Sequence, residues 1–234
     1  SSAASDVYKR QIEHFRKVIK LRPHHPHAYN NLGAVLINLG KYQEAKSNLK
    51  KAIELQPDYA EAYNNLGNVY KEMEEYNQAI SVYEKAIELN PEYYEAYNNL
   101  GAVLGNNEQY EEAEKVLKQV IKLQPDFVEA LNNLGSILTC MEKYEESKAI
   151  LNRSIEIHPS NAEALSNLGD IYRKLDEHEH AVDHYERAIQ IKPNYYEAFN
   201  KIGIVLQNQG NLKDALSYYR KTISLKPEFA DAYN

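Results

Sequence analysis

The chain has 234 residues, of which 43% are hydrophobic and 26% are charged, as is ordinary for a folded protein. Its net charge of −7 argues against a protein that coats nucleic acid, and no apolar run is long enough to span a bilayer. The single cysteine, Cys140, cannot form an internal disulfide. A single cysteine is compatible with a reducing compartment or with export without cross-links. We expect the reducing compartment, that is, a cytoplasmic location.

The first eleven residues, SSAASDVYKRQ, lack the features of a signal or transit peptide. They resemble a translated sequencing adapter, so residues 1–11 are expected to be a non-native tail and native sequence to begin near Ile12. Residues 12–25 are predicted to form the second helix of a partial repeat. Residues 230–234 read as the start of a truncated repeat, so we expect the chain to be a fragment.

Between these ends the chain repeats itself every 34 residues. Glycine recurs at this spacing from Gly33 to Gly203, and proline does so at Pro23, Pro57, Pro91, Pro125, Pro159, Pro193 and Pro227. A fixed period of this length predicts a solenoid of similar units. The whole units are 26–59, 60–93, 94–127, 128–161, 162–195 and 196–229.

Each unit has the pattern of two amphipathic helices. In the unit 60–93, the apolar residues of the first segment, such as Leu66 and Val69, fall on one side of a helix. A second amphipathic segment runs over 76–89 and stops before Pro91, because proline cannot donate a hydrogen bond inside a helix. Small residues such as Gly67 mark the point where the paired helices approach each other.

These positions resemble the signature of the tetratricopeptide repeat (TPR) family. The matching residues of the second unit are Tyr63, Leu66, Gly67, Tyr70, Ala79, Tyr83, Ala86 and Pro91. The resemblance covers residues 12–234 and implies an all-α, right-handed TPR solenoid of stacked antiparallel helix pairs. It also implies a protein- or peptide-binding scaffold without catalysis or a cofactor in this segment.

Two adjacent places of the first helix hold asparagine, as in the motif EAYNNLG at 61–67 and 95–101. Places are numbered here from the first residue of each unit. The fifth place holds Asn30, Asn64, Asn98, Asn132, Ser166 and Asn200. The sixth place holds Asn31, Asn65, Asn99, Asn133, Asn167 and Lys201. Because asparagine is about 0.5–0.7 kcal/mol worse than alanine inside a helix, ten of them cost roughly 5 kcal/mol.

Two interpretations account for this cost. The amides could bridge neighbouring repeats, or they could form a row that holds the backbone of an extended peptide, since a carboxamide both donates and accepts. The TPR superhelix of O-GlcNAc transferases carries a similar asparagine ladder along its concave groove, and this resemblance favours the second interpretation. The candidate peptide-binding residues are the asparagines from Asn30 to Asn132 at the fifth place, those from Asn31 to Asn167 at the sixth, and Asn68 at the ninth. The ninth place otherwise varies between units.

Other functions were weighed against this one. The chain could be the substrate-recognition arm of a larger transferase whose catalytic domain lies beyond residue 234. A carboxylate clamp for acidic chain ends needs lysine at the fifth place, and only Lys201, at the sixth, comes near that pattern. The second-place glutamates, Glu61, Glu95, Glu129, Glu163 and Glu197, either line an acidic rim that favours basic peptides or complement the helix dipole.

The histidines, the expected partners and the last helix give three further expectations. His24, His25 and His27 in one turn, and His180 and His184 on one helix, are interpreted as surface histidines, because the order His-Glu-x-x-His is absent. No nucleic-acid or membrane partner and no metal are expected. The apolar face of the last helix, with Leu216, Tyr219 and Ile223, is expected to be partly uncovered and to permit end-to-end self-association.

Overall fold

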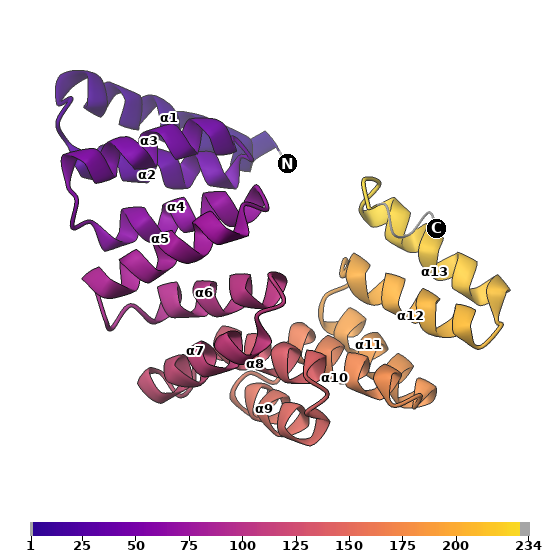
Figure 1. The fold of residues 1–234 in the computed structure, drawn as a ribbon. Helices are drawn as coiled ribbons and strands as arrows, with labels where there is room; N and C mark the ends of the chain where they lie inside the picture. The colour runs from indigo at the N-terminus through magenta and orange to yellow at the C-terminus, as the bar shows by residue number, and fades with distance from the viewer. Residues whose placement is uncertain (1, 230–234) are drawn as a thin grey trace. The chain divides into compact units, whose positions relative to one another are not determined.

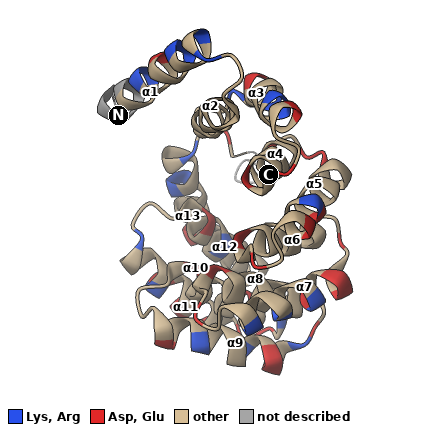
Figure 2. Cartoon of the chain, turned by 90° about the vertical axis from the view of Figure 1, so that its left-hand side faces the viewer, with Lys and Arg blue, Asp and Glu red and all other residues tan. Residues whose placement is uncertain are grey.

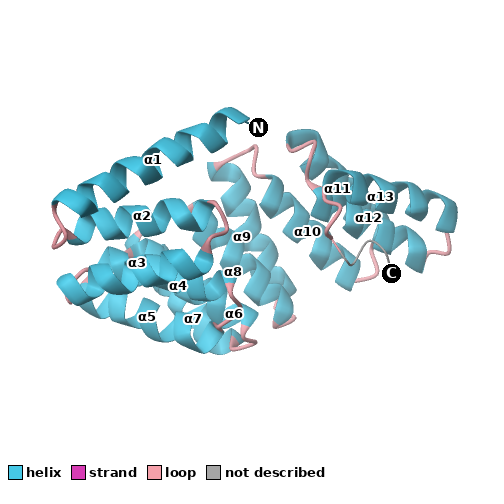
Figure 3. Ribbon diagram, turned by 90° about the horizontal axis from the view of Figure 1, so that it is seen from above, coloured by secondary structure: helices cyan, strands magenta, loops and turns pink. Residues whose placement is uncertain are grey.

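The computed structural model describes residues 2–229, with side chains from residue 7, and this part of the chain is helical throughout, without strands (Figures 1 and 3). The prediction of an all-α protein is therefore confirmed. None of the described helices is long and apolar enough to cross a membrane.

The chain divides into two compact units, Ser1–Pro125 and Asp126–Asn234, a division that the sequence analysis did not predict. The helices of the first unit are α1 (Ser2–Leu21), α2 (Pro26–Asn38), α3 (Tyr42–Leu55), α4 (Ala60–Glu72), α5 (Tyr76–Leu89), α6 (Tyr94–Asn106) and α7 (Tyr110–Leu123). Those of the second unit are α8 (Val128–Cys140), α9 (Tyr144–Ile157), α10 (Ala162–Lys174), α11 (His178–Ile191), α12 (Tyr196–Asn208) and α13 (Leu212–Leu225).

Within each unit, consecutive helices pack against each other as antiparallel pairs (Figure 1). The first helices of successive repeats also touch, as α2 touches α4 and α8 touches α10. Acidic and basic residues are spread over the helices of both units (Figure 2). The first helices of the repeats are therefore neighbours, and their side chains can interact from one repeat to the next.

The turn inside each repeat passes through left-handed backbone at the same place. Glycine with φ of 68° and 77° occupies it at Gly40 and Gly210, while the other four repeats use acidic residues. These are Glu74, Glu108, Glu142 and Asp176, with φ of 59° to 60°. Because left-handed backbone costs a residue with a side chain roughly 1–2 kcal/mol, the helix packing on both sides must hold these turns in place.

The close approach of paired helices explains the conserved spacing of the glycines within the chain. A Cβ atom added at Gly67 would lie 2.4 Å from Cε1 of Tyr83, whose ring is fully buried. Gly33 meets the side chain of Leu49 in the same way, at 2.6 Å. These distances are too short for non-bonded carbon atoms, so the first helix tolerates only glycine where it crosses the second.

We predict that Gly67→Ala destabilises the protein by about 1–3 kcal/mol, because the buried Tyr83 ring has no free space to enter. Urea unfolding followed by circular dichroism measures the change. Ser81→Ala, at an exposed position of α5, is the control and should change stability by less than about 0.5 kcal/mol. An unchanged midpoint for Gly67→Ala would contradict the packing argument.

Candidate functional site

The sixth-place asparagines of the first unit donate hydrogen bonds to the preceding repeat. Asn65 Nδ2 donates to Oδ1 of Asn30 at 2.9 Å. Asn99 Nδ2 donates to Oδ1 of Asn64 at 3.0 Å. The donors are partly exposed, whereas the acceptors Asn30 and Asn64 are 5% and 6% exposed. In the motifs at Asn30 and Asn64, the two adjacent asparagines therefore have different environments: the first is buried in the repeat interface and the second is more exposed.

The buried fifth-place amides have a second partner at the last place of their own repeat. Asn30 Nδ2 donates to the hydroxyl of Tyr59 at 3.3 Å. The hydroxyl of Tyr93 is likewise hydrogen-bonded to Asn64, which lowers the pKa of Tyr93 but less than burial and the carboxylates of Glu95 and Glu61 raise it. The side chains of Asn30 and Asn64 thus have partners within the protein, and they hold the sixth-place amides of Asn65 and Asn99 in position.

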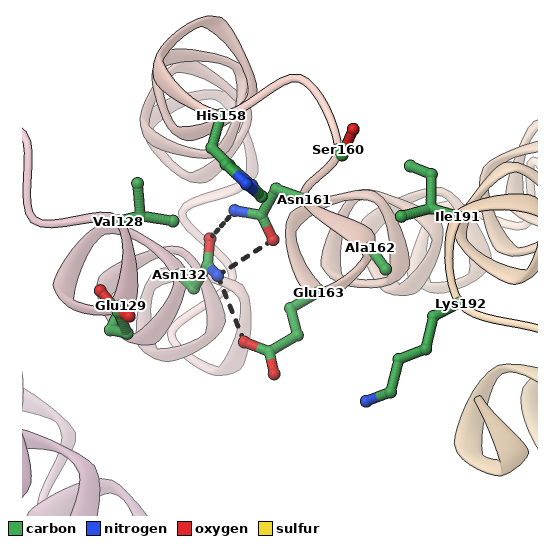
Figure 4. A pocket seen from close by; sticks show the side chains of 10 residues that line it. All are labelled: Val128, Glu129, Asn132, His158, Ser160, Asn161, Ala162, Glu163, Ile191 and Lys192. Carbon is green, nitrogen blue, oxygen red and sulfur yellow. Dashed lines mark hydrogen bonds between the residues drawn. The ribbon is translucent and has the colours of Figure 1, made fainter. Parts of the chain in front are cut away.

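The second unit builds the same interface with a denser network (Figure 4). Asn132 exchanges hydrogen bonds with Asn161, at 3.0 Å and 3.3 Å, and also donates to Oε2 of Glu163 at 3.3 Å. The hydroxyl of Ser154 donates to Asn132 Oδ1 at 2.8 Å. Because that oxygen is already occupied, Nδ2 of Asn167 donates instead to the backbone carbonyl of Asn132, at 3.3 Å.

Lys201 replaces asparagine at the sixth place of the last whole repeat and keeps the contact. Its Nζ lies 3.0 Å from Oγ of Ser166 and 2.6 Å from Oδ2 of Asp170. Ser166 is fully buried, and Asn30, Asn64 and Asn132 at the same place are buried as well. A donor at the sixth place bonded to a buried group at the fifth is therefore common to both units, whichever residues supply it.

The hydrogen bond to the preceding repeat uses only part of each sixth-place amide. Among the residues that the structure describes, Oδ1 of Asn65, Asn99 and Asn167 accepts no hydrogen bond. Asn31 is exposed and accepts only a long bond of 3.5 Å from Asn30. Asn98 and Asn133 are engaged in further interactions. Three ladder amides thus have a free carbonyl oxygen and a second N–H.

In the first five whole units, the residue at the ninth place depends on which side chain packs against the glycine at the eighth place. In the sixth unit, Tyr219 packs on Gly203, but the ninth place holds Ile204 and the tyrosine hydroxyl donates to Gln207 instead. Asn68 Oδ1 accepts from the hydroxyl of Tyr83 at 2.7 Å, and Asp170 accepts from that of Tyr185 at 2.8 Å. Where leucine replaces this tyrosine, the ninth place holds Ala34, Ala102 or Ser136. The residue found at the ninth place, such as Asn68, is therefore tied to packing in these five units.

Carboxylates of the second place also interact with the interface. Burial and, after it, the nearby carboxylate of Glu61, which is hydrogen-bonded to Tyr59, together raise the pKa of Tyr59 to about 12. Burial likewise raises the pKa of Tyr195 to about 12. The last-place tyrosines were not recognised as interface residues from the sequence, although their spacing of 34 residues was a usable signal.

The histidines have protein partners. His27 Nδ1 lies 2.7 Å from the hydroxyl of Tyr59. His180 Nδ1 is 3.2 Å from Oε2 of Glu177, and His184 Nδ1 is 2.8 Å from the carbonyl of His180. Within the described residues, no group of three or more His, Cys, Asp or Glu side chains could hold a metal ion.

We predict a loss of stability in alkali. The pKa values of Tyr59, Tyr93 and Tyr195 are about 12 in the folded protein, against 10.0 for a free tyrosine. Between these pH values the unfolded chain ionises and the folded chain does not, so the free energy of unfolding should fall as the pH rises. The triple variant with phenylalanine at these places, as at Phe127, should show a shallower fall in urea titrations. An equally steep fall would contradict the assignment.

Comparison with known proteins agrees with this architecture. The family model of the cilia and flagella-associated protein 70 C-terminal domain matches residues 1–198, and a tetratricopeptide repeat model matches residues 184–217. No curated protein matches the chain.

Solved structures are similar as well. YrrB, described as a TPR protein with an unusual peptide-binding site, is 29% identical with a TM-score of 0.60, over 79% of this chain and 95% of that one. A TPR protein from Parabacteroides merdae is 20% identical with a TM-score of 0.84, over 95% and 88%. A chain of the APC/C hetero-tetramer Cut9–Hcn1 is 18% identical with a TM-score of 0.81, over 97% of this chain but 45% of its own length.

These likenesses confirm the predicted TPR solenoid fold. The 34-residue period, the antiparallel helix pairs and the family match over residues 1–198 agree, and the chain belongs to the tetratricopeptide-repeat family of the cilia and flagella-associated protein 70 C-terminal domain.

Proposed function

We propose that the protein is a peptide-binding scaffold, in which the sixth-place asparagines of each unit hold the backbone of an extended peptide. The observation that carries the proposal is the state of Asn65 and Asn99: one N–H is bonded to the preceding repeat, and the carbonyl oxygen is free. An amide fixed in this way is oriented before a ligand arrives, which reduces the entropy lost on binding.

The spacing of the ladder suits an extended chain. Neighbouring helices pack about 8–10 Å apart, and an extended peptide rises about 3.3 Å per residue. Successive ladder amides would therefore contact about every third residue of the ligand. A free oxygen and a free N–H can pair with one peptide N–H and one carbonyl, so the contact does not depend on the ligand side chain.

The other candidate residues act behind or beside the ladder in this proposal. The buried amides of Asn30, Asn64 and Asn132 position the sixth-place donors, and Asn98 at the same place is assigned the same role. Asn68 lies on the first helix with its oxygen bonded to Tyr83 and offers its N–H groups to a ligand. Peptide recognition by YrrB, at 29% identity, gives this kind of function a precedent within the fold.

We extend the proposal to the charge of the ligand. The second-place glutamates recur at one end of every first helix from α4 to α12, four residues before the ladder amide. Four residues correspond to about 6 Å along a helix, within reach of a lysine or arginine of a peptide bound at the ladder. The carboxylates also serve the interface, as Glu163 does when it accepts a hydrogen bond from Asn132.

Lys201, which replaces asparagine at the sixth place, suggests variants that test ligand binding separately from stability. We predict that Asn65→Lys with Asn99→Lys keeps the repeat interface, because lysine can donate to Asn30 and Asn64 as Lys201 does to Ser166. The free amide oxygens are lost, so the affinity for peptides selected from a random library on the native protein should fall about tenfold, at about 0.5–1.5 kcal/mol per hydrogen bond. Fluorescence polarisation measures the affinity.

Two controls accompany this pair of variants. Ala102→Lys adds one positive charge to α6, as Asn99→Lys does, without touching a ladder amide, and it should bind normally. Asn65→Ala with Asn99→Ala should also lose binding but melt earlier, since each change leaves a buried acceptor without its donor, at about 1–3 kcal/mol per site. The affected peptides should be rich in lysine and arginine. Native affinity in the lysine variant would contradict the role of the ladder.

Self-association remains a prediction. Leu212 and Leu216 on α13 are 61% and 54% exposed, and Oδ1 of Asn200 is buried without a partner among the described residues. If this face mediates association, the native chain should sediment as a concentration-dependent oligomer and Leu216→Glu as a monomer. A native chain that stays monomeric at high concentration would refute the prediction.

The broader alternatives also remain predictions. One alternative is that the chain is the substrate-recognition arm of a larger transferase. A catalytic domain encoded in the same reading frame after residue 234 would support this hypothesis, and a stop codon soon after residue 234 would contradict it. The name of the matched family suggests searching for peptide ligands among proteins of cilia and flagella. A cytoplasmic location can be tested by imaging a tagged chain.

A further inference from the structure

A hollow of about 260 Å³ opens on the second unit, beside the ladder amide Asn167. It is formed by side chains from the first helices of three successive repeats, α8, α10 and α12. The residues that matter for its chemistry are Cys140, Asn167, Asp170, Arg173, Lys174 and Lys201.

The hollow carries an excess of positive charge. Three cationic side chains and one carboxylate line it, which gives a net charge of +2 in a chain whose net charge is −7. The carboxylate of Asp170 is already shared: it accepts from Tyr185 at 2.8 Å and pairs with Lys201 at 2.6 Å, and Arg173 lies 3.8 Å away. One carboxylate with three donors around it cannot neutralise the remaining cations.

These cations retain hydrogen-bonding capacity. Nε of Arg173 is buried and has no acceptor among the described residues. Lys201 uses two of its three N–H groups, on Ser166 and Asp170. Lys174 is exposed. Arg173 and Lys174 lie in the last turn of α10, where cations complement the helix dipole, but the dipole does not explain why Lys201 of another helix joins them.

We propose that this cationic hollow binds a carboxylate group of a peptide held along the second unit. The inference rests on the proposed function and deepens it, because it assigns a residue preference to a ligand whose backbone the ladder holds. Asn167 and Arg173 are six residues apart on α10, about 9 Å, so an acidic side chain or a chain end at Asn167 reaches the guanidinium. These cationic residues differ from a carboxylate clamp, which needs lysine at the fifth place.

The two ends of α10 at this surface carry opposite charges. Glu163 lies in the first turn of α10 and Arg173 in its last, ten residues or about 15 Å apart, with Asn167 between them. Successive side chains of an extended peptide point to opposite sides. A ligand with a basic residue toward Glu163 and an acidic one toward Arg173 therefore complements the surface on both sides.

The chain offers a direct probe, because its only cysteine, Cys140, is exposed in the wall of the hollow. Alkylation by iodoacetate, which carries a carboxylate, is compared with alkylation by neutral iodoacetamide at low ionic strength. The ratio of the two rates cancels the reactivity of the thiol itself. We expect this ratio to be about threefold or more higher in the folded protein than in the urea-unfolded chain, from the attraction of two net charges at short range.

Two variants and a control test the direction in which the ratio of alkylation rates changes. Lys174→Gln should lower the ratio, and Asp170→Asn, which reproduces the Asn68–Tyr83 pair of the first unit, should raise it. Lys213→Gln, at an exposed position of α13, is the matched control and should leave it unchanged. Circular dichroism verifies that each variant is folded. A folded-state ratio no higher than the unfolded one, or a ratio indifferent to Lys174→Gln, overturns the proposal.

Competition identifies the source of the carboxylate. N-acetyl-aspartic acid α-amide, with a side-chain carboxylate, and N-acetylglycine, with a chain-end carboxylate, should slow the alkylation of Cys140, and the stronger competitor indicates the source. N-acetyl-asparaginamide should not protect, and equal protection by this neutral compound overturns the proposal. Since no peptide on the ladder is needed, these results are independent of the lysine variants at Asn65 and Asn99, and either proposal can fail without the other.

Discussion

The structure depends on one hydrogen bond between neighbouring repeats, from a donor at the sixth place to a buried group at the fifth place of the repeat before. Asn65 makes it to Asn30, and Lys201 makes it to Ser166. Because the fifth-place groups are buried, losing the donor would leave a polar atom without a partner, at about 1–3 kcal/mol. That penalty is larger than the cost of placing an asparagine in a helix, so the poor helix formers persist.

The same bond links stacking to ligand recognition. A primary amide has two N–H groups and a carbonyl oxygen, and the bond to the preceding repeat uses one N–H. Asn65 and Asn99 therefore serve the solenoid and retain a free carbonyl oxygen, which we propose for a ligand. The structural and functional interpretations of the asparagines are not exclusive, and a melting experiment alone cannot separate them. Lysine at the sixth place separates them because it donates without accepting.

Charge differs between the two ends of α10. Carboxylates such as Glu163 occupy the first turn of α10, and Arg173 and Lys174 occupy its last turn. The helix dipole favours this order in any helix. Side chains of three first helices, α8, α10 and α12, meet at one hollow, and this arrangement brings Lys201 to Asp170 and concentrates cations beside Asn167.

The sequence by itself determined the period, the helix pairs, the glycine at each crossing and the family resemblance, because all of these follow from spacing along one chain. It could not distinguish Asn64 from Asn65, since both lie on the polar side of the same amphipathic pattern. Only the packed helices show that one is buried and the other partly exposed, because adjacent residues differ by about 100° around a helix. The pairing of Asn68 with Tyr83 and the meeting of Arg173 with Lys201 were also decided by tertiary structure. Contacts across 15 to 35 residues depend on how neighbouring helices pack, which no local pattern specifies.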